Sequence, residues 1–208
     1  MRCRHTIQKM RVIAGTYRSR QLLAPKGEQT RPTSDRLRET LFNILAPRVD
    51  GCRFVDLYAG TGAVGIEALS RGAAHVWFAE NTPPAVAAIR SNLAALKIAR
   101  GFTLEDRGVG AMLQRLGKLT QPVDLVYLDP PYEAAAEYEG TLNFLGSSRG
   151  RLILAPDAVV IAEHSSKAKL AARYGALEHT HLRKQGDAAL SFFAIPAAEQ
   201  SPHPDDDL

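Results

Sequence analysis

The chain has 208 residues, 45% of them hydrophobic, and a formal net charge of +4. This length and composition suit one folded domain with a buried core. No apolar run approaches the ~20 residues that a membrane helix needs, and residues 1–9 lack the apolar core of a secretory signal. The two cysteines, Cys3 and Cys52, make neither a disulfide framework nor a metal-ligand pattern. We therefore expect a cytoplasmic protein that binds neither a membrane nor a metal.

The charge is unevenly distributed along the chain. Residues 1–53 contain 12 Arg and Lys against 4 Asp and Glu, whereas residues 54–208 contain 14 against 18. A basic amino-terminal segment on a mildly acidic body favours a polyanionic partner, with nucleic acid as the first candidate. An ordinary solvated basic segment is the alternative.

Residues 10–50 are predicted to form a basic arm that consists of a hairpin and a helix. The hairpin is expected to pair residues 11–14 with residues 21–24. Residues 1–9 are interpreted as an amino-terminal extension, with Met10 as an alternative start.

The helix of the arm is expected to begin after Thr33 or Ser34, which suit a helix cap, and to end at Pro47. Apolar residues recur on one face of this helix at helical spacing. The residues expected on that buried face are Leu37, Leu41, Ile44 and Leu45, and those expected elsewhere are Arg36, Arg38 and Asn43.

Residues 51–196 alternate between strand and helix patterns. This alternation predicts an α/β fold with a doubly wound, mostly parallel sheet of seven strands, one of them made antiparallel by a terminal hairpin. Residues 197–208 are predicted to be a disordered acidic tail. The expected strands are 54–57, 75–79, 102–105, 123–128, 159–162, 177–183 and 188–195, and the expected helices are 63–71, 83–96, 110–116 and 134–145.

A glycine-rich loop, Gly60-Thr-Gly-Ala-Val-Gly65, follows the first of these strands. Glycines let the backbone approach a ligand, and Glu80 lies where a carboxylate can bind ribose hydroxyls. Asp56 precedes Gly60 by four residues, where its charge would repel a pyrophosphate but suits an amine or a sulfonium. The pattern therefore indicates S-adenosylmethionine, although a tight strand-to-helix turn would also explain the glycines.

A second motif, Asp129-Pro-Pro-Tyr132, ends the fourth strand, because prolines cannot continue it. Ligands of open α/β sheets bind at such carboxyl ends of strands. The carboxylate of Asp129 and the carbonyl of Pro130 can accept hydrogen bonds from an exocyclic amine, and Pro131 keeps the turn rigid. Tyr132 can stack on a base, a contact worth ~1–3 kcal/mol. A strand-ending turn with a buried tyrosine is the structural alternative.

The two loops, taken with the basic arm, resemble a known family. The arm carries Arg11-Val-Ile-Ala-Gly15, Tyr17-Arg-Ser-Arg20 and Arg31-Pro-Thr-Ser-Asp-Arg-Leu-Arg-Glu-Thr-Leu-Phe-Asn43. These segments resemble the RsmD-type family of bacterial Rossmann-like methyltransferases, and the similarity extends from Met10 to Ile195. The resemblance implies transfer of a methyl group from S-adenosylmethionine to the 2-amino group of a guanine in 16S ribosomal RNA. The RNA would be free, in the small subunit or in an assembly intermediate.

The resemblance also implies roles for individual residues. The catalytic, base-binding residues would be Asp129, Pro130, Pro131 and Tyr132. The residues at the methionine end of the cofactor would be Asp56, Tyr58, Gly60 and Gly62. Glu80 would bind the ribose, and Asp106 is assigned to the adenine, although Glu105-Asp-Arg-Gly-Val109 departs from the family pattern. The residues expected to bind RNA phosphates are Arg18, Arg20, Arg31 and Arg36.

Three other functions stay open. An amino-methyltransferase acting on adenine in RNA or DNA would share the Asp129 motif, and only the arm argues for guanine. A nicotinamide-dependent oxidoreductase could use residues 60–65 but would leave residues 129–132 without a role. A non-catalytic RNA-binding or ribosome-assembly protein would have little reason to keep both motifs intact.

Overall fold

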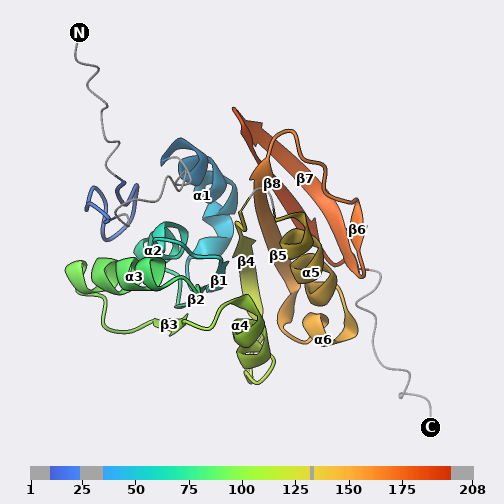
Figure 1. Ribbon diagram of the computed structural model, residues 1–208, viewed down its shortest axis with the longest axis horizontal. Coiled ribbons are helices and arrows are strands. Elements are labelled where there is room, and N and C mark those ends of the chain that lie inside the picture. The colour runs from blue at the N-terminus through green and yellow to red at the C-terminus, as the bar shows by residue number, and fades with distance from the viewer. Residues whose placement is uncertain (1–9, 24–34, 132–133, 198–208) are drawn as a thin grey trace.

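The computed structural model describes residues 10–23, 35–131 and 134–197, in which a mixed sheet is covered by helices on both faces (Figure 1). The predicted extension and residues 198–208 of the predicted tail lie outside the described residues. The strands are β1 (Arg53–Leu57), β2 (His75–Ala79), β3 (Phe102–Glu105), β4 (Val123–Leu128), β5 (Leu154–Ser165), β6 (Arg173–Tyr174), β7 (Leu177–Gln185) and β8 (Ala188–Ala194). The helices are α1 (Asp35–Val49), α2 (Ala63–Ser70), α3 (Pro83–Ala95), α4 (Val109–Leu116), α5 (Ala135–Leu145) and α6 (Ser148–Arg151).

The strand order is β3-β2-β1-β4-β5-β8-β7-β6. The first five strands pair in parallel, whereas β8 is antiparallel to both β5 and β7. The chain extends from β1 to β3 in one direction and then returns to the other side of β1 for β4. The predicted α/β class is therefore confirmed. The order reverses between β1 and β4, where folds of this type bind ligands at the carboxyl ends of the strands.

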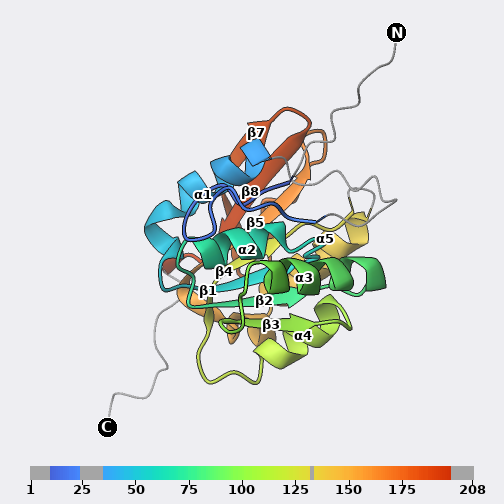
Figure 2. The same cartoon turned by 90° about the vertical axis from the view of Figure 1, so that its left-hand side faces the viewer.

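The helices form two layers, with α1, α2 and α3 on one face of the sheet and α4, α5 and α6 on the other (Figures 1 and 2). Alternate residues of each strand point to opposite faces. On β1, Phe54 packs into the core beneath the first layer, and Val55 packs into the core beneath the second. Within the described residues, no helix combines the length and the hydrophobicity needed to cross a bilayer.

The sheet differs from the prediction at its last strands. Eight strands replace the expected seven among the described residues, because Arg173 and Tyr174 pair antiparallel with β7 as the short β6. Two strands, β6 and β8, therefore run against the others instead of one. β5 begins at Leu154 rather than at Val159, and its register with β4 shifts along this added stretch. The short helix α6 had no counterpart in the prediction. Its four residues are too few for a periodic signal.

Residues 10–23 form a hairpin with one bridge, between Arg11 and Gln21, instead of two paired strands of four residues. Backbone hydrogen bonds of 2.9 Å join the N–H of Val12 to the carbonyl of Arg20 and the N–H of Leu22 to the carbonyl of Met10. The pairing ends there because the next backbone N–H groups bind side chains of α2 and α3 instead. Ala24, the last residue of the predicted hairpin, lies outside the described residues.

Helix α1 departs from the predicted pattern in three ways. It continues past Pro47 to Val49, which is buried, so the proline removes one backbone bond in the last turn without ending the helix. Ile44, expected on the buried face, is 40% exposed. Arg38, expected elsewhere, is fully buried at 0% exposure, where its Nη2 donates to the carbonyl of Arg11 and to Asp35 and its Nε lies 3.9 Å from Glu67. The proposed caps Thr33 and Ser34 lie outside the described residues.

Polar side chains, all of them buried except the partly exposed Arg71, fasten the hairpin to the body, and we call this set the arm anchor. The arm anchor comprises Arg38, Glu67, Ser70, Arg71 and Asn92. The carboxylate of Glu67 accepts hydrogen bonds from the N–H groups of Ile13 and Ala14, at 2.7 and 3.0 Å. Nε of Arg71 donates to Glu67 at 2.7 Å. Nη2 of Arg38 donates to the carbonyl of Arg11 at 2.5 Å, while its Nε lies 3.9 Å from Glu67.

The rest of the arm anchor acts at the two ends of the hairpin. Oγ of Ser70 accepts a hydrogen bond from the N–H of Tyr17 at 2.9 Å and donates to the carbonyl of Ala14 at 2.5 Å. The Asn92 amide binds both the N–H and the carbonyl of Leu23, at 2.7 and 3.1 Å. The hairpin thus lies along α2, as Figure 2 shows, and joins the core on this face through Met10, Val12 and Leu22.

Candidate active site

The segments at the carboxyl ends of four neighbouring strands, β1 to β4, contact one another. The N–H of Ala59, after β1, donates to the carbonyl of Ala79 at 3.0 Å, and the N–H of Glu80 donates to the carbonyl of Glu105 at 3.1 Å. The N–H of Asp129, after β4, lies 3.4 Å from the carbonyl of Leu57. The predicted cofactor and catalytic loops are therefore neighbours across the point where the strand order reverses.

The loop after β1 is held in a left-handed conformation. Tyr58, Gly60 and Gly62 have φ values of 61°, 54° and 76°. Glycine adopts this conformation at no steric cost, whereas Tyr58 is a non-glycine residue in a region that such residues rarely occupy. At Gly62 a Cβ would also lie 3.2 Å from Ile89. The loop therefore presents a tightly turned backbone ahead of α2, which suits a ligand that lies against it.

Asp56 lies beneath this loop rather than at its mouth. The residue is only 1% exposed, and its Oδ2 accepts a hydrogen bond from the N–H of Gly65 at 2.9 Å. Burial raises the pKa of Asp56 from 3.8 to about 8, the Gly65 N–H lowers it in part, and the charge of Glu80 adds to the rise. At neutral pH its carboxyl is therefore protonated, and a positively charged ligand above the loop would favour its ionisation.

Glu80 joins the loop to the start of α3. Its Oε2 accepts from the N–H of Gly60 at 2.9 Å. Its Oε1 accepts from the N–H of Asn81 and from both the N–H and the hydroxyl of Thr82, each at 2.9 Å. A carboxylate has about four acceptor positions, so Oε2 retains capacity for a ribose hydroxyl.

The two acidic residues at the end of β3, Glu105 within the strand and Asp106 after it, have different surroundings. Asp106 is exposed, and its Oδ2 lies 3.0 Å from Nη2 of Arg90. Glu105 is only 4% exposed, and its Oε1 accepts from Nε of Arg107 at 2.7 Å. Hydrogen bonding to Arg107 holds the pKa of Glu105 below its ordinary value. The assignment of Asp106 to the adenine stays a prediction.

The loop after β4 leaves the sheet at Asp129. Pro130 is buried, and Pro131 is exposed. The hydroxyl of Tyr138 on α5 lies 3.2 Å from the carbonyl of Pro130 and 2.8 Å from the carbonyl of Glu163 on β5. The phenol has one hydrogen to donate, so its shorter bond to Glu163 leaves acceptor capacity on Pro130. Tyr132 lies outside the described residues.

Tyr58 connects the two loops through α5. Its hydroxyl donates to Glu137 Oε2 at 2.7 Å and lies 3.0 Å from Oγ1 of Thr141. Burial raises the pKa of Tyr58 above its ordinary value. Three residues of this site were not predicted from the sequence, because only their helical spacing on α5 places them beside the loops and no motif marks them: Glu137, Tyr138 and Thr141.

The predicted RNA-binding arginines do not lie in one place. The side chains of Arg18, Arg20 and Arg36 are exposed and have no hydrogen bond or ion pair within the described part of the chain. Arg18 and Arg20 lie in the hairpin turn beside Ser70, at the end of α2 that is ~12 Å along the helix from the glycine loop. Arg36 lies in the first turn of α1. Arg31 lies outside the described residues.

No three His, Cys, Asp or Glu side chains within the described ranges are placed to hold a metal ion. The groups available to bind a ligand are instead backbone N–H groups and side-chain carboxylates. The glycine loop, Glu80 and the buried Asp56 suit a ligand that carries both a ribose and a positive charge.

Comparisons with known proteins agree with this geometry. The family model of conserved hypothetical protein 95 matches residues 10–194. The chain is similar to the putative rRNA methyltransferase YlbH of Bacillus subtilis, with 32% identity over 184 residues, which cover 88% of this chain and 98% of that protein. It is also 35% identical over 155 residues to ribosomal RNA small subunit methyltransferase D of Escherichia coli K12, covering 74% of each. Among solved structures, the putative methyltransferase yhhF from Escherichia coli matches with a TM-score of 0.76 and 30% identity, over 91% of this chain and 99% of that one.

Proposed function

The chain belongs to the family of conserved hypothetical protein 95, and we propose that it transfers a methyl group from S-adenosylmethionine to a base of small-subunit ribosomal RNA. The base is a guanine, and the acceptor is its 2-amino group. One observation carries this proposal: the loop that suits the cofactor and the loop that suits the amine adjoin at the switch between β1 and β4.

The residues of the first loop fit the cofactor. Glu80 offers Oε2 to the ribose, and the backbone at Gly60 and Gly62 allows close approach. Asp56 acts from beneath the loop, where its ionisation would complement the positive charge of the ligand. S-adenosylmethionine, when bound, supplies the methyl group and an excellent leaving group at its sulfonium.

The second loop prepares the acceptor. The lone pair of the guanine amine is delocalised into the ring, and the amine is far too weak an acid for a carboxylate to deprotonate it beforehand. The carboxylate of Asp129 and the carbonyl of Pro130 accept hydrogen bonds from the amine and so localise its lone pair toward the methyl group. The proton then leaves to Asp129 or to water during or after transfer.

Positioning supplies most of the rate in this scheme, because in-line alignment of two bound reactants can lower a barrier by ~7–11 kcal/mol. Tyr138 supports that alignment, since its buried hydroxyl lies between the carbonyls of Pro130 and Glu163. Stacking of the extracted base on Tyr132 would offset the few kcal/mol that extraction costs. Arg36, near the start of α1, is available for a phosphate.

The decisive experiment combines purified protein, tritiated S-adenosylmethionine and ribosomal RNA or small subunits from a strain that lacks the family enzyme. The nucleosides are then separated and identified by mass spectrometry. Guanosine labelled on its 2-amino group is the expected product. Label on adenosine would keep the chemistry and overturn the substrate, whereas cofactor binding without label would favour a non-catalytic assembly protein.

The Asp129→Ala variant tests the assigned residue. Turnover should be abolished while the Kd of the cofactor stays within about twofold, since Asp129 acts on the acceptor amine and each factor of ten corresponds to ~1.4 kcal/mol. Asp157→Ala is the matched control, because Asp157 is an exposed carboxylate whose pair with Arg48 is of a kind worth ~0–1 kcal/mol. Retained activity in the Asp129 variant would refute the assignment.

A further inference from the structure

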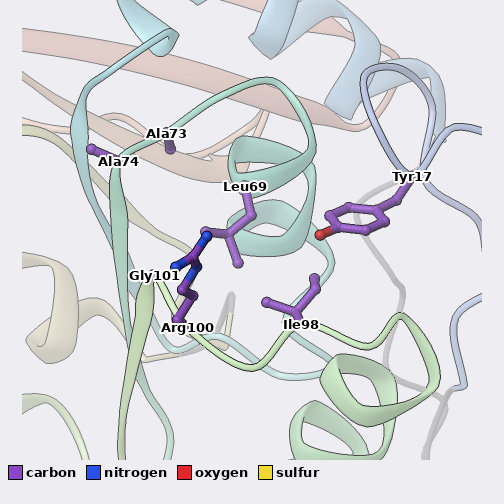
Figure 3. A pocket seen from close by; sticks show the side chains of 7 residues that line it. All are labelled: Tyr17, Leu69, Ala73, Ala74, Ile98, Arg100 and Gly101. Atoms are coloured by element: carbon purple, nitrogen blue, oxygen red, sulfur yellow. The ribbon is translucent and has the colours of Figure 1, made fainter.

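A pocket of about 370 Å³ lies at the amino ends of β2 and β3, away from the carboxyl ends that carry the active site. This volume lies within the ~300–1,000 Å³ of typical ligand pockets. Tyr17 of the hairpin turn and Arg100, just before β3, face each other across it, with Leu69 and Ile98 between them (Figure 3). Neither the catalytic loops nor the proposed cofactor residues line this pocket.

Two polar side chains that line this pocket are available to bind a ligand. Within the described residues, neither the hydroxyl of Tyr17 nor the guanidinium of Arg100 takes part in a hydrogen bond or an ion pair. The pocket therefore offers an aromatic ring whose hydroxyl points inward, and a planar cation, neither of them engaged by another described residue (Figure 3). This combination suits a nucleotide, because bases stack on tyrosine rings and guanidinium groups bind phosphate in a bidentate manner.

The wall that carries Tyr17 is rigidly placed. The N–H of Tyr17 donates to Oγ of Ser70, and the N–H of Thr16 donates to the carbonyl of Ser70 at 2.7 Å. Gly15 allows this approach, since a Cβ there would lie 1.8 Å from the carbonyl oxygen of Ser70. A turn whose backbone is already fixed loses little freedom when it binds a ligand, which favours a binding role over an incidental surface hollow.

Charge around the pocket favours RNA as its occupant. Arg18 and Arg20 follow Tyr17 in the same turn, and Lys97 precedes Ile98, which also lines the pocket; the side chains of Arg18, Arg20 and Lys97 are exposed. We infer that this pocket binds an unpaired nucleotide of the substrate RNA, away from the methylated base. The inference rests on the proposed function. It extends the RNA-binding surface from the carboxyl ends of the strands, along α2, to the amino ends of β2 and β3.

Kinetics with 16S ribosomal RNA as the varied substrate test this inference. Tyr17→Ala should raise the KM for RNA about fivefold or more, the lower range for loss of a stacked base. Arg100→Ala should weaken RNA binding and reduce the slope of log affinity against log salt by about one. Neither variant should change the Kd for S-adenosylmethionine or the kcat at saturating RNA. Arg149→Ala on α6 is the matched control, since it removes an exposed arginine on the other face of the sheet.

The outcomes are distinguishable from failure of the proposed function. An unchanged KM in both variants, with methylation intact, would overturn the pocket and leave the function standing. An increase seen only with assembled subunits, and not with free 16S RNA, would also overturn it, because the occupant would then be a ribosomal protein. Ultraviolet crosslinking of the wild-type protein to RNA, followed by mass spectrometry, should yield an adduct on the peptide that contains Tyr17. If the wild-type protein methylates no RNA, the proposed function fails first.

Discussion

On one face of the sheet, α4 and α5 are held by apolar side chains such as Met112, Leu142 and Leu145. On the other face, the hairpin of residues 10–23 is held mainly by the arm anchor. The difference follows from backbone hydrogen bonding. A helix satisfies its own N–H and carbonyl groups, so an apolar stripe is enough to hold it, whereas a segment without regular structure must find partners for each buried group.

This comparison also accounts for three buried ionisable side chains. Glu67, Arg38 and Asp56 all lie on the face of the hairpin, and each binds a backbone group of the hairpin or of the glycine loop. Irregular backbone on this face is thus satisfied by ionisable side chains beneath it. Both loops that we assign to ligand and RNA binding depend on it.

Removal of Glu67 should break this arrangement most severely. Glu67→Ala would leave Ile13 and Ala14 with unpaired N–H groups and Arg38 with Asp35 as its remaining carboxylate. Loss of one partner from a buried ion pair costs about 3–5 kcal/mol, which should appear in the free energy of unfolding measured with urea. Glu67→Gln, which keeps an acceptor oxygen, should lose less. A loss below about 1 kcal/mol in the alanine variant would show that the arm anchor contributes little.

Leu142→Ala probes the apolar face and should cost somewhat less. Leu142 is fully buried on α5, and such truncations cost about 2–5 kcal/mol. The two variants should differ in where the loss appears. Native-state hydrogen exchange at the amides of Ile13 and Ala14 should accelerate in the Glu67 variant through local opening, and should follow only the global stability in the Leu142 variant. Equal local acceleration in both would contradict the division between the two faces.

A third effect, which appears only when the pH is changed, is expected from titration of Asp56, a buried carboxyl on the polar face that has no opposing charge among the described residues. Its pKa of about 8 in the folded protein lies above the ordinary 3.8, so its proton disfavours unfolding and this contribution falls as the pH rises from about 4 to about 8. A cationic ligand favours the ionised form, so its binding should release a proton.

Calorimetry with S-adenosylmethionine measures this linkage. Affinity should increase with pH by up to about tenfold per unit below pH 8 and level off above it. Asp56→Asn, which cannot ionise, should flatten the profile. A profile that is already flat in the wild-type protein would show that Asp56 is not coupled to the ligand.

The sequence predicted the central sheet well because its signals are local. The apolar runs at residues 54–57, 75–79, 102–105 and 123–128 became β1 to β4 with at most one residue of difference. The glycine loop and Asp129 also lie at adjacent strand ends, as the alternating pattern implies. Each of these features is encoded in fewer than ten consecutive residues.

The features that the prediction missed depend on distant partners. The hydrophobic periodicity of α1 predicts that Arg38 lies at the surface, and nothing in the sequence of α1 indicates that Arg38 will lie beside the buried Glu67. The sequence does not distinguish Tyr138 and Thr141 from other helix residues, because their role depends on the fold, which places α5 beside Tyr58 and Pro130. The predicted roles of Asp129 and Asp56 stay predictions that the variants above can test, and those of Glu80 and Asp106 also stay predictions.

The arm anchor also has a consequence for the order in which the protein takes shape during synthesis. The hairpin leaves the ribosome before α2 and α3, yet Glu67 and Ser70 follow the hairpin residues that they bind by 53 to 56 residues, and Asn92 follows Leu23 by 69. Contacts of such long sequence separation form late, because a long loop must close before they stabilise anything. The hairpin therefore reaches its final position only after α2 and α3 exist, which makes the ordering of the hairpin a late event in the maturation of the enzyme.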